Sequence, residues 1–258
     1  MYVDNRGRSG CQAVIAVGIA GVAVAAYFVR ASINSVTGEK RHIDISAEQE
    51  IALGEQVAPE LVARYGGEDP DRAARQYVAE IGKEVVSRSQ AGKSGYKFQF
   101  HDLADEKTVD AFDLPGGQVF ITRGLLTKLT SSGQLAAILG HECAHVLARH
   151  RAEQFSSLRD AQGKIVPAAG PLIGQLLDVG YGRSDELEAD RLGVRLMSEA
   201  GFDPRSMIEA MEILKQASKG GHDPAFFSTH PNPDNREDEI RKEIAARFPN
   251  GIPFGLTR

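Results

Sequence analysis

A chain of 258 residues with 42% hydrophobic side chains is long enough for one or two domains with a substantial core. Its formal net charge is −5, so its electrostatics give no reason to expect nucleic acid as a partner. Two cysteines cannot build a disulfide framework, and no internal repeat indicates a solenoid. These properties are typical of a single globular domain.

The N-terminal segment has the composition of a membrane anchor. Residues 13–29 are apolar throughout, with Arg6 and Arg8 before them and Arg30 after them. We expect an uncleaved transmembrane helix, although its length is near the lower limit for one. A signal peptide cleaved at Ala23-Val24-Ala25 is the alternative. The positive charge before the segment favours a cytoplasmic N-terminus and a periplasmic domain.

The rest of the chain divides into a polar linker, residues 31–45, and one domain, residues 46–258. Ser46 and Gln49 predict a capping box at the start of a helix. A second helix is expected over residues 70–89, and strands over residues 96–101, 108–113 and 118–122. The sequence therefore predicts an α+β fold, mostly helical, with a small antiparallel sheet packed on helices.

An apolar run between Leu135 and Leu147 contains three polar residues, His141, Glu142 and His145. On a helix the two histidines lie one turn apart on one face, where they can share a zinc ion. Glu142 can then act as general base toward water. Two satisfied core histidines would be the alternative interpretation, but burying such groups without a partner is costly.

The third ligand is expected downstream of this motif. One class of zinc proteases continues the motif with Gly and His, but Ala148 and Arg151 occupy those positions and exclude that class. Glu186 and Asp190 are four residues apart, so one helix face can present both. Glu186 can bind the metal while Asp190 accepts a hydrogen bond from a ligand imidazole. A solvated acidic helix start is the other interpretation.

A long apolar segment separates these two motifs. Residues 165–179, within the insert 151–183, are too short and too often broken by Pro and Gly to span a membrane. The insert is either a helical hairpin of the core or a mobile cover over the active site.

Several separate sequence pieces together resemble the M48 family of zinc metallopeptidases. The resemblance covers residues 45–245 and is strongest to the small periplasmic quality-control branch. The pieces are Ala111-Phe112, Leu114-Pro115-Gly116-Gly117, residues 122–126 (TRGLL), 141–145 (HECAH), 186–190 (ELEAD), 200–204 (AGFDP) and 228–231 (STHP).

The resemblance implies a zincin-type fold with one zinc per chain on His141, His145 and Glu186, and Glu142 as base. It also implies roles near the metal for His230 and Arg236. The chain departs from the family pattern at Asp110, where relatives usually carry Asn.

We therefore expect a metalloendopeptidase that hydrolyses internal peptide bonds of misfolded or surplus envelope proteins. A zinc-stabilised chaperone or assembly factor without catalysis is the alternative, although Glu142 would be unnecessary there. Processing of prenylated proteins is disfavoured because multiple spanning helices are lacking. Residues 118–122 are expected to form an edge strand beside the zinc cleft that pairs with unfolded polypeptide. His230 is expected near the fourth zinc position, as an inhibitory latch or as a donor to the tetrahedral intermediate.

Overall fold

The computed structural model describes residues 31–157, 179–218, 225–231 and 235–258. The anchor expected in residues 13–29 and most of the predicted cover lie outside the described residues. None of the helices in the described ranges is both long and apolar enough to cross a membrane.

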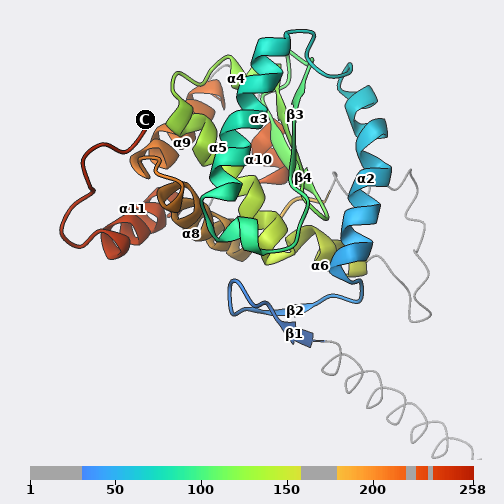
Figure 1. The fold of residues 1–258 in the computed structure, drawn as a ribbon, viewed down its shortest axis with the longest axis horizontal. Coiled ribbons are helices and arrows are strands. Elements are labelled where there is room, and N and C mark those ends of the chain that lie inside the picture. Colours follow the sequence, from blue (N-terminus) through green and yellow to red (C-terminus); the bar gives the residue numbers. More distant parts are fainter. Residues whose placement is uncertain (1–30, 158–178, 219–224, 232–234) are drawn as a thin grey trace, which may run out of the picture.

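The described chain consists mainly of helices around a small sheet (Figure 1), which confirms the predicted α+β class. In chain order the elements are β1 (Ala31–Ile33), β2 (Lys40–His42), α2 (Ala47–Arg64), α3 (Arg72–Ser87), η1 (Gln90–Lys93), β3 (Gln99–Leu103), β4 (Ala111–Leu114), β5 (Gln118–Thr122), α4 (Arg123–Leu126), α5 (Ser132–Ala148), α6 (His150–Ser157), α8 (Arg183–Glu199), α9 (Arg205–Ser218), α10 (Ala225–Thr229) and α11 (Arg236–Arg247). The capping box of Ser46 and Gln49 is present at the start of α2, as predicted.

The sheet formed by β3, β4 and β5 is mixed, which corrects the prediction of an antiparallel sheet. Its order is β3-β5-β4, with β5 parallel to β3 and antiparallel to β4. The prediction that β5 is an edge strand is therefore wrong, because β5 is the central strand and β4 lies at the edge. Side-chain alternation shows which face of a strand is buried but does not determine which strands are neighbours.

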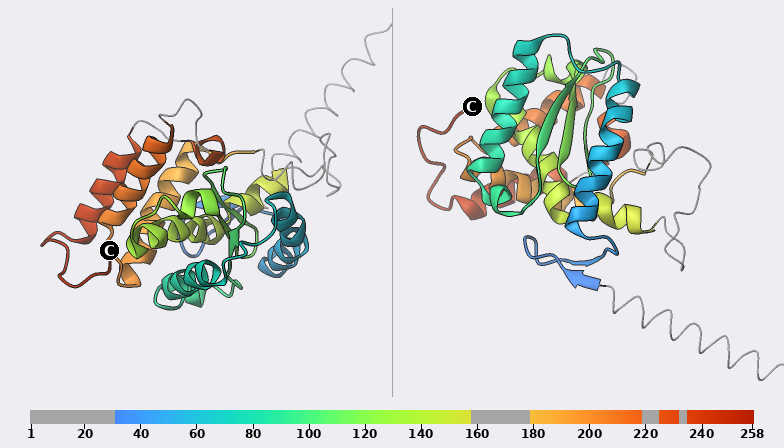
Figure 2. Two further views of the ribbon diagram at one scale, coloured as in Figure 1. Left: turned by 90° about the horizontal axis from the view of Figure 1, so that it is seen from above. Right: turned by 45° about the vertical axis from the view of Figure 1, so that its right-hand side comes forward.

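The two faces of the sheet contribute to different cores. Phe112 and Phe120 pack with Leu61 of α2 on one face. Val119 and Ile121 belong to the main core on the other face, together with residues of α5. Helices α8 and α9 pack on the side of α5 away from the sheet, and α11 packs on α8 and α9 (Figure 2). This arrangement buries α5 in the centre of the domain.

Residues 31–45, expected to be a linker, contain an antiparallel hairpin of β1 and β2. The hairpin lies close to α6, at the lower edge of the domain in Figure 1. The Asn34 side chain donates a hydrogen bond from Nδ2 to the Leu147 carbonyl oxygen at 2.8 Å. The segment is therefore held against the helix that carries the predicted metal motif.

Candidate metal centre

Helix α5 places the two predicted histidine ligands on one face. The Ser131 side chain caps the helix by accepting a hydrogen bond from the Gln134 backbone N–H. The largely apolar sequence of α5 allows the helix to be buried on all sides. The Nε2 atoms of His141 and His145 lie 3.0 Å apart. This separation follows from the four-residue spacing and is short enough for one ion to contact both rings.

Helix α8 brings Glu186 to the same point. Its Oε1 lies 3.4 Å from His145 Nε2, and its Oε2 lies 3.5 Å from His141 Nε2. The helices can approach this closely because Gly193 has no side chain: a Cβ there would lie 3.3 Å from the His141 backbone. The structure thus brings together the three residues that the sequence predicted as ligands.

His230 completes a group of four potential metal-binding side chains. Its Nδ1 lies 3.1 Å from Glu186 Oε1 and 3.4 Å from His141 Nε2. One ligand atom from each of His141, His145, Glu186 and His230 falls within 4.8 Å of the others. His230 therefore lies among the expected metal ligands, at the position suggested by the family resemblance.

Asp190 and Arg236 contact the expected ligands His141 and Glu186. Asp190 Oδ1 lies 3.0 Å from His141 Nδ1, which is the contact expected from the sequence. Arg236 donates to both Asp190 oxygens at 2.6 and 2.9 Å, and its Nη1 lies 3.0 Å from Glu186 Oε2. Asp190 can therefore fix the tautomer of His141, leaving its Nε2 available for a metal.

The side chains of this cluster have shifted pKa values in opposite directions. Burial lowers the pKa of His145 well below its usual value, which keeps the ring neutral as a ligand must be. Burial would also lower the pKa of His141, but hydrogen bonds with Asp190 and Glu186 raise it to about 9. The pKa of Glu186 is well below its usual value despite burial, because His230 and Arg236 favour the carboxylate. A metal ion bound here would therefore meet an ionised Glu186 and a neutral His145, and would have to replace the proton of His141.

Glu142 occupies an unusual environment for a carboxylate. It is fully buried, and among the described residues neither of its oxygens has a hydrogen-bond partner. The pKa of Glu142 is raised well above its usual value, first by burial and further by the charge of Asp113. Burying a carboxylate without a hydrogen-bond partner costs the fold free energy. A general base that accepts a proton during a reaction is consistent with this environment.

Tyr181 and His150 also contact the site, and sequence analysis did not identify either. The Tyr181 ring stacks on the His145 ring at 3.7 Å between centroids, and its backbone N–H donates to the Thr229 carbonyl at 2.8 Å. His150 Nδ1 lies 2.7 Å from His145 Nδ1. The position of His150, five residues after His145, could have suggested a role near the motif. No neighbouring residue in the sequence marks Tyr181 as part of the site.

Comparison with known proteins shows which family the chain belongs to. The model of peptidase family M48 matches residues 72–244. The mitochondrial metalloendopeptidase OMA1 of Schizosaccharomyces pombe is 32% identical over 84% of this chain and 67% of its own length. OMA1 of Bos taurus is 31% identical over 84% of this chain. The beta-barrel assembly-enhancing protease of Escherichia coli is 28% identical over 76% of this chain.

The chain belongs to peptidase family M48, as the sequence motifs indicated, and is therefore a metallopeptidase that acts on polypeptides. It spans less than half the length of the Bos taurus and Escherichia coli relatives, at 47% and 44%.

Proposed function

We propose that this protein is a zinc-dependent metalloendopeptidase that cleaves internal peptide bonds of misfolded or surplus envelope proteins. One observation carries the proposal. Glu142 lies beside four converging side chains that could bind a metal. It is fully buried, and its carboxylate has no hydrogen-bond partner among the described residues. A structural zinc site would need the ligands but would not need this carboxylate.

In this proposal His141, His145 and Glu186 hold the zinc, while Asp190 and Arg236 keep His141 and Glu186 oriented. Zinc bound there would polarise the scissile carbonyl and activate water at neutral pH. Glu142 takes the proton from the attacking water and delivers it to the leaving amine.

The substrate would bind along β4, since β4 rather than β5 is the strand at the sheet edge next to α5. An extended peptide can add to such an edge through main-chain hydrogen bonds, which favours unfolded clients over particular sequences. In this structure α10 contacts β4, and the Phe226 N–H donates to the Val109 carbonyl at 3.2 Å. A peptide would therefore have to displace α10.

The same displacement would involve His230, which directly follows α10. His230 is fully buried, and its Nδ1 lies among the proposed ligand atoms. We favour the latch role for this residue: His230 would hold the metal together with His141, His145 and Glu186 until a peptide moves α10. The role as a donor to the tetrahedral intermediate would instead require the ring to act with substrate bound.

The proposed location is a membrane, with residues 1–30 as an anchor and the domain on the periplasmic side. The apolar composition of residues 13–29 supports this, as do relatives named for mitochondria and for beta-barrel assembly. Clients among membrane or envelope proteins follow from the same reasoning. Processing and complete degradation are both compatible with this site.

The full chain purified in detergent provides the test. We expect it to cleave an unfolded protein but not its native form, to lose activity on chelation, and to recover it with zinc. Glu142→Gln should retain one zinc per chain and lose at least about a hundredfold in rate. Cleavage by this variant at the normal rate would refute the role of Glu142. A wild-type chain that binds zinc and prevents aggregation without cutting would instead support the chaperone alternative.

A further inference from the structure

Helix α10, which directly precedes the proposed latch residue, contacts a short segment that leads into α8. The Tyr181 backbone N–H donates to the Thr229 carbonyl oxygen at 2.8 Å. A Cβ at Gly180 would lie 2.9 Å from the Ser228 carbonyl oxygen and 3.1 Å from that of Thr229. Side chains do not tolerate such distances, so the two backbones can approach this closely only because residue 180 is a glycine. We call residues 179–181 the seat of α10.

The backbone of the seat is fixed to α6. Arg151 donates from Nη1 to the Val179 carbonyl oxygen at 3.0 Å. Gln154 donates from Nε2 to the Gly180 carbonyl oxygen at 3.2 Å. Two successive carbonyl groups of the seat are therefore satisfied by side chains of one helix, which holds the segment in a defined position.

The Tyr181 side chain fixes the seat to the sheet and to α5. Its hydroxyl donates to Asp113 Oδ1 in β4. Its ring stacks on His145 at 3.7 Å between centroids, and the Arg151 guanidinium carbon lies 4.2 Å from the ring centroid. The seat is thus attached to β4, α5 and α6, none of which would have to move with α10.

Helix α10 itself has few such attachments. Within the described residues, two backbone hydrogen bonds join it to other elements, one from Tyr181 to Thr229 and one from Phe226 to the Val109 carbonyl oxygen at 3.2 Å. The third attachment is the His230 ring, whose Nδ1 lies 3.1 Å from Glu186 Oε1. The seat therefore supplies one of three points that hold α10 over the metal centre, and this point involves no metal-binding side chain.

We propose that residues 179–181 keep α10 in the closed position, and that they do so whether or not a metal is bound. The inference deepens the proposed function, since it rests on the role of α10 and His230 as a latch. It adds the element against which the latch closes: a fixed backbone segment with a glycine at the point of contact. The consequence is that removal of zinc does not release α10, whereas a side chain at position 180 does.

Hydrogen–deuterium exchange of residues 225–230 in the full chain tests this directly, because amide exchange reports local opening. We expect slow exchange of this segment in the zinc-loaded wild type and in the wild type stripped by a chelator. Gly180→Ala should speed exchange roughly 10- to 100-fold in both forms, since overpacking at the contact favours the open state. Basal cleavage by the zinc-loaded variant should rise as well. The φ angle of Gly180 is not positive, so alanine meets no backbone strain there.

Gly92→Ala is the matched control for the glycine. A Cβ there would also lie 2.9 Å from a backbone oxygen, that of Val86, but Gly92 belongs to η1, which packs on α3 and α8. This variant should lower thermal stability and leave exchange of residues 225–230 unchanged. Wild-type exchange in Gly180→Ala would overturn the proposal, and so would loss of protection in the wild type when zinc is removed.

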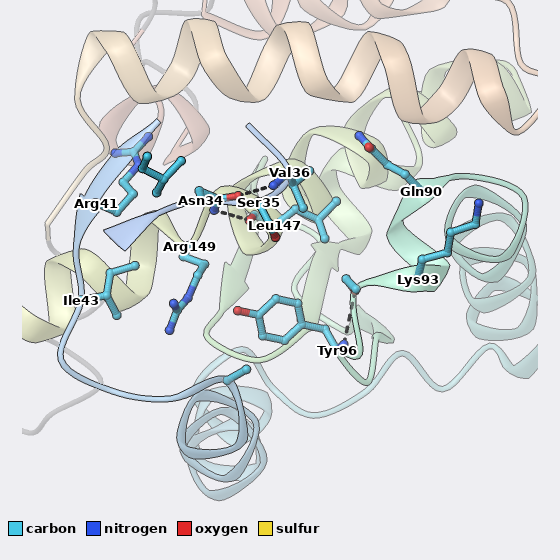
Figure 3. A pocket seen from close by; sticks show the side chains of 13 residues that line it. Asn34, Ser35, Val36, Arg41, Ile43, Gln90, Lys93, Tyr96, Leu147 and Arg149 are labelled. Atoms are coloured by element: carbon cyan, nitrogen blue, oxygen red, sulfur yellow. Dashed lines mark hydrogen bonds between the residues drawn. The ribbon is translucent and has the colours of Figure 1, made fainter. Parts of the chain in front are cut away.

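Tyr181→Phe is the second variant, and it decides if Gly180→Ala fails to fold. It keeps the ring but removes the hydroxyl that joins the seat to Asp113, so exchange of residues 225–230 should increase. Tyr96→Phe removes a hydrogen bond of the same kind, from the Tyr96 hydroxyl to Glu50 Oε2 at 3.1 Å. Tyr96 lines a separate pocket beside Arg149 (Figure 3), so this control should leave the exchange unchanged. Equal exchange in the two variants would contradict the role of Tyr181.

Failure of the proposed function would look different. If Gly180→Ala speeds exchange but does not raise cleavage, the seat exists and α10 is not the barrier to substrate. If His230→Ala raises cleavage while Gly180→Ala and Tyr181→Phe leave both exchange and cleavage unchanged, the latch stands and only the seat is refuted. A wild-type chain that binds no zinc would refute the metal site, and exchange in that chain would still test the seat.

Discussion

His230→Ala tests whether this structure is a self-inhibited form of the enzyme. The His230 ring is fully buried, stacks on Phe226 at 4.3 Å between centroids, and has its Nδ1 3.1 Å from Glu186 Oε1. His141 and Glu142 are no more than 2% exposed. A peptide cannot reach Glu142 in this arrangement, so the closed form must open before cleavage.

The size of the expected effect follows from the contact that is lost. A hydrogen bond to a charged group contributes about 1.5–3 kcal/mol. Removing it shifts the balance between closed and open forms by roughly ten- to a hundredfold, and basal cleavage should rise by up to that factor. Phe226→Ala, which removes the stacking partner but leaves the contact between His230 and Glu186, should raise the rate by less.

Initial rates on an unfolded protein at saturating zinc provide the measurement, with zinc content determined in parallel. The increase should disappear when Glu142→Gln is added, which shows that it comes from the same site. A lower rate with zinc retained would favour His230 as a donor to the tetrahedral intermediate and refute the latch. An unchanged rate would refute both roles.

Two further substitutions test the packing and electrostatics around the site. Asp110 is buried, and burial raises its pKa from 3.8 to about 8, although the charge of Arg151 opposes this. A carboxyl whose pKa is raised in the folded state stabilises the fold at acidic pH. Its contribution to the free energy of unfolding is lost as pH rises from 3.8 to about 8. The loss amounts to at most about 1.4 kcal/mol per pH unit. Asp110→Asn should remove this dependence in thermal unfolding across that range, and parallel curves for both proteins would contradict the assignment. Gly193→Leu should destabilise the domain by about 1–3 kcal/mol and weaken zinc binding, because its side chain would meet Met207 and the His141 backbone; unchanged unfolding and zinc affinity would show that α8 can move away freely.

The sequence alone determined the local geometry of the proposed metal centre. Residues four apart lie on the same face of a helix. This places His141 with His145 on α5, and Glu186 with Asp190 on α8. The Ser46 capping box and the bounds of β5 were also predictable, since short-range hydrogen bonds and turns fix them. His230 was placed near the metal only through the family resemblance, because its contacts lie far along the chain.

Only the tertiary structure decided which distant elements meet. The central position of β5 depends on the path taken by residues 104–110, which side-chain periodicity does not encode. Arg41 and His150 are 109 residues apart, and no local pattern marks an arginine in a polar segment as a partner of a buried histidine. Such contacts arise from the packing of whole elements, so the contact between the hairpin and His150 is decided only by the tertiary structure.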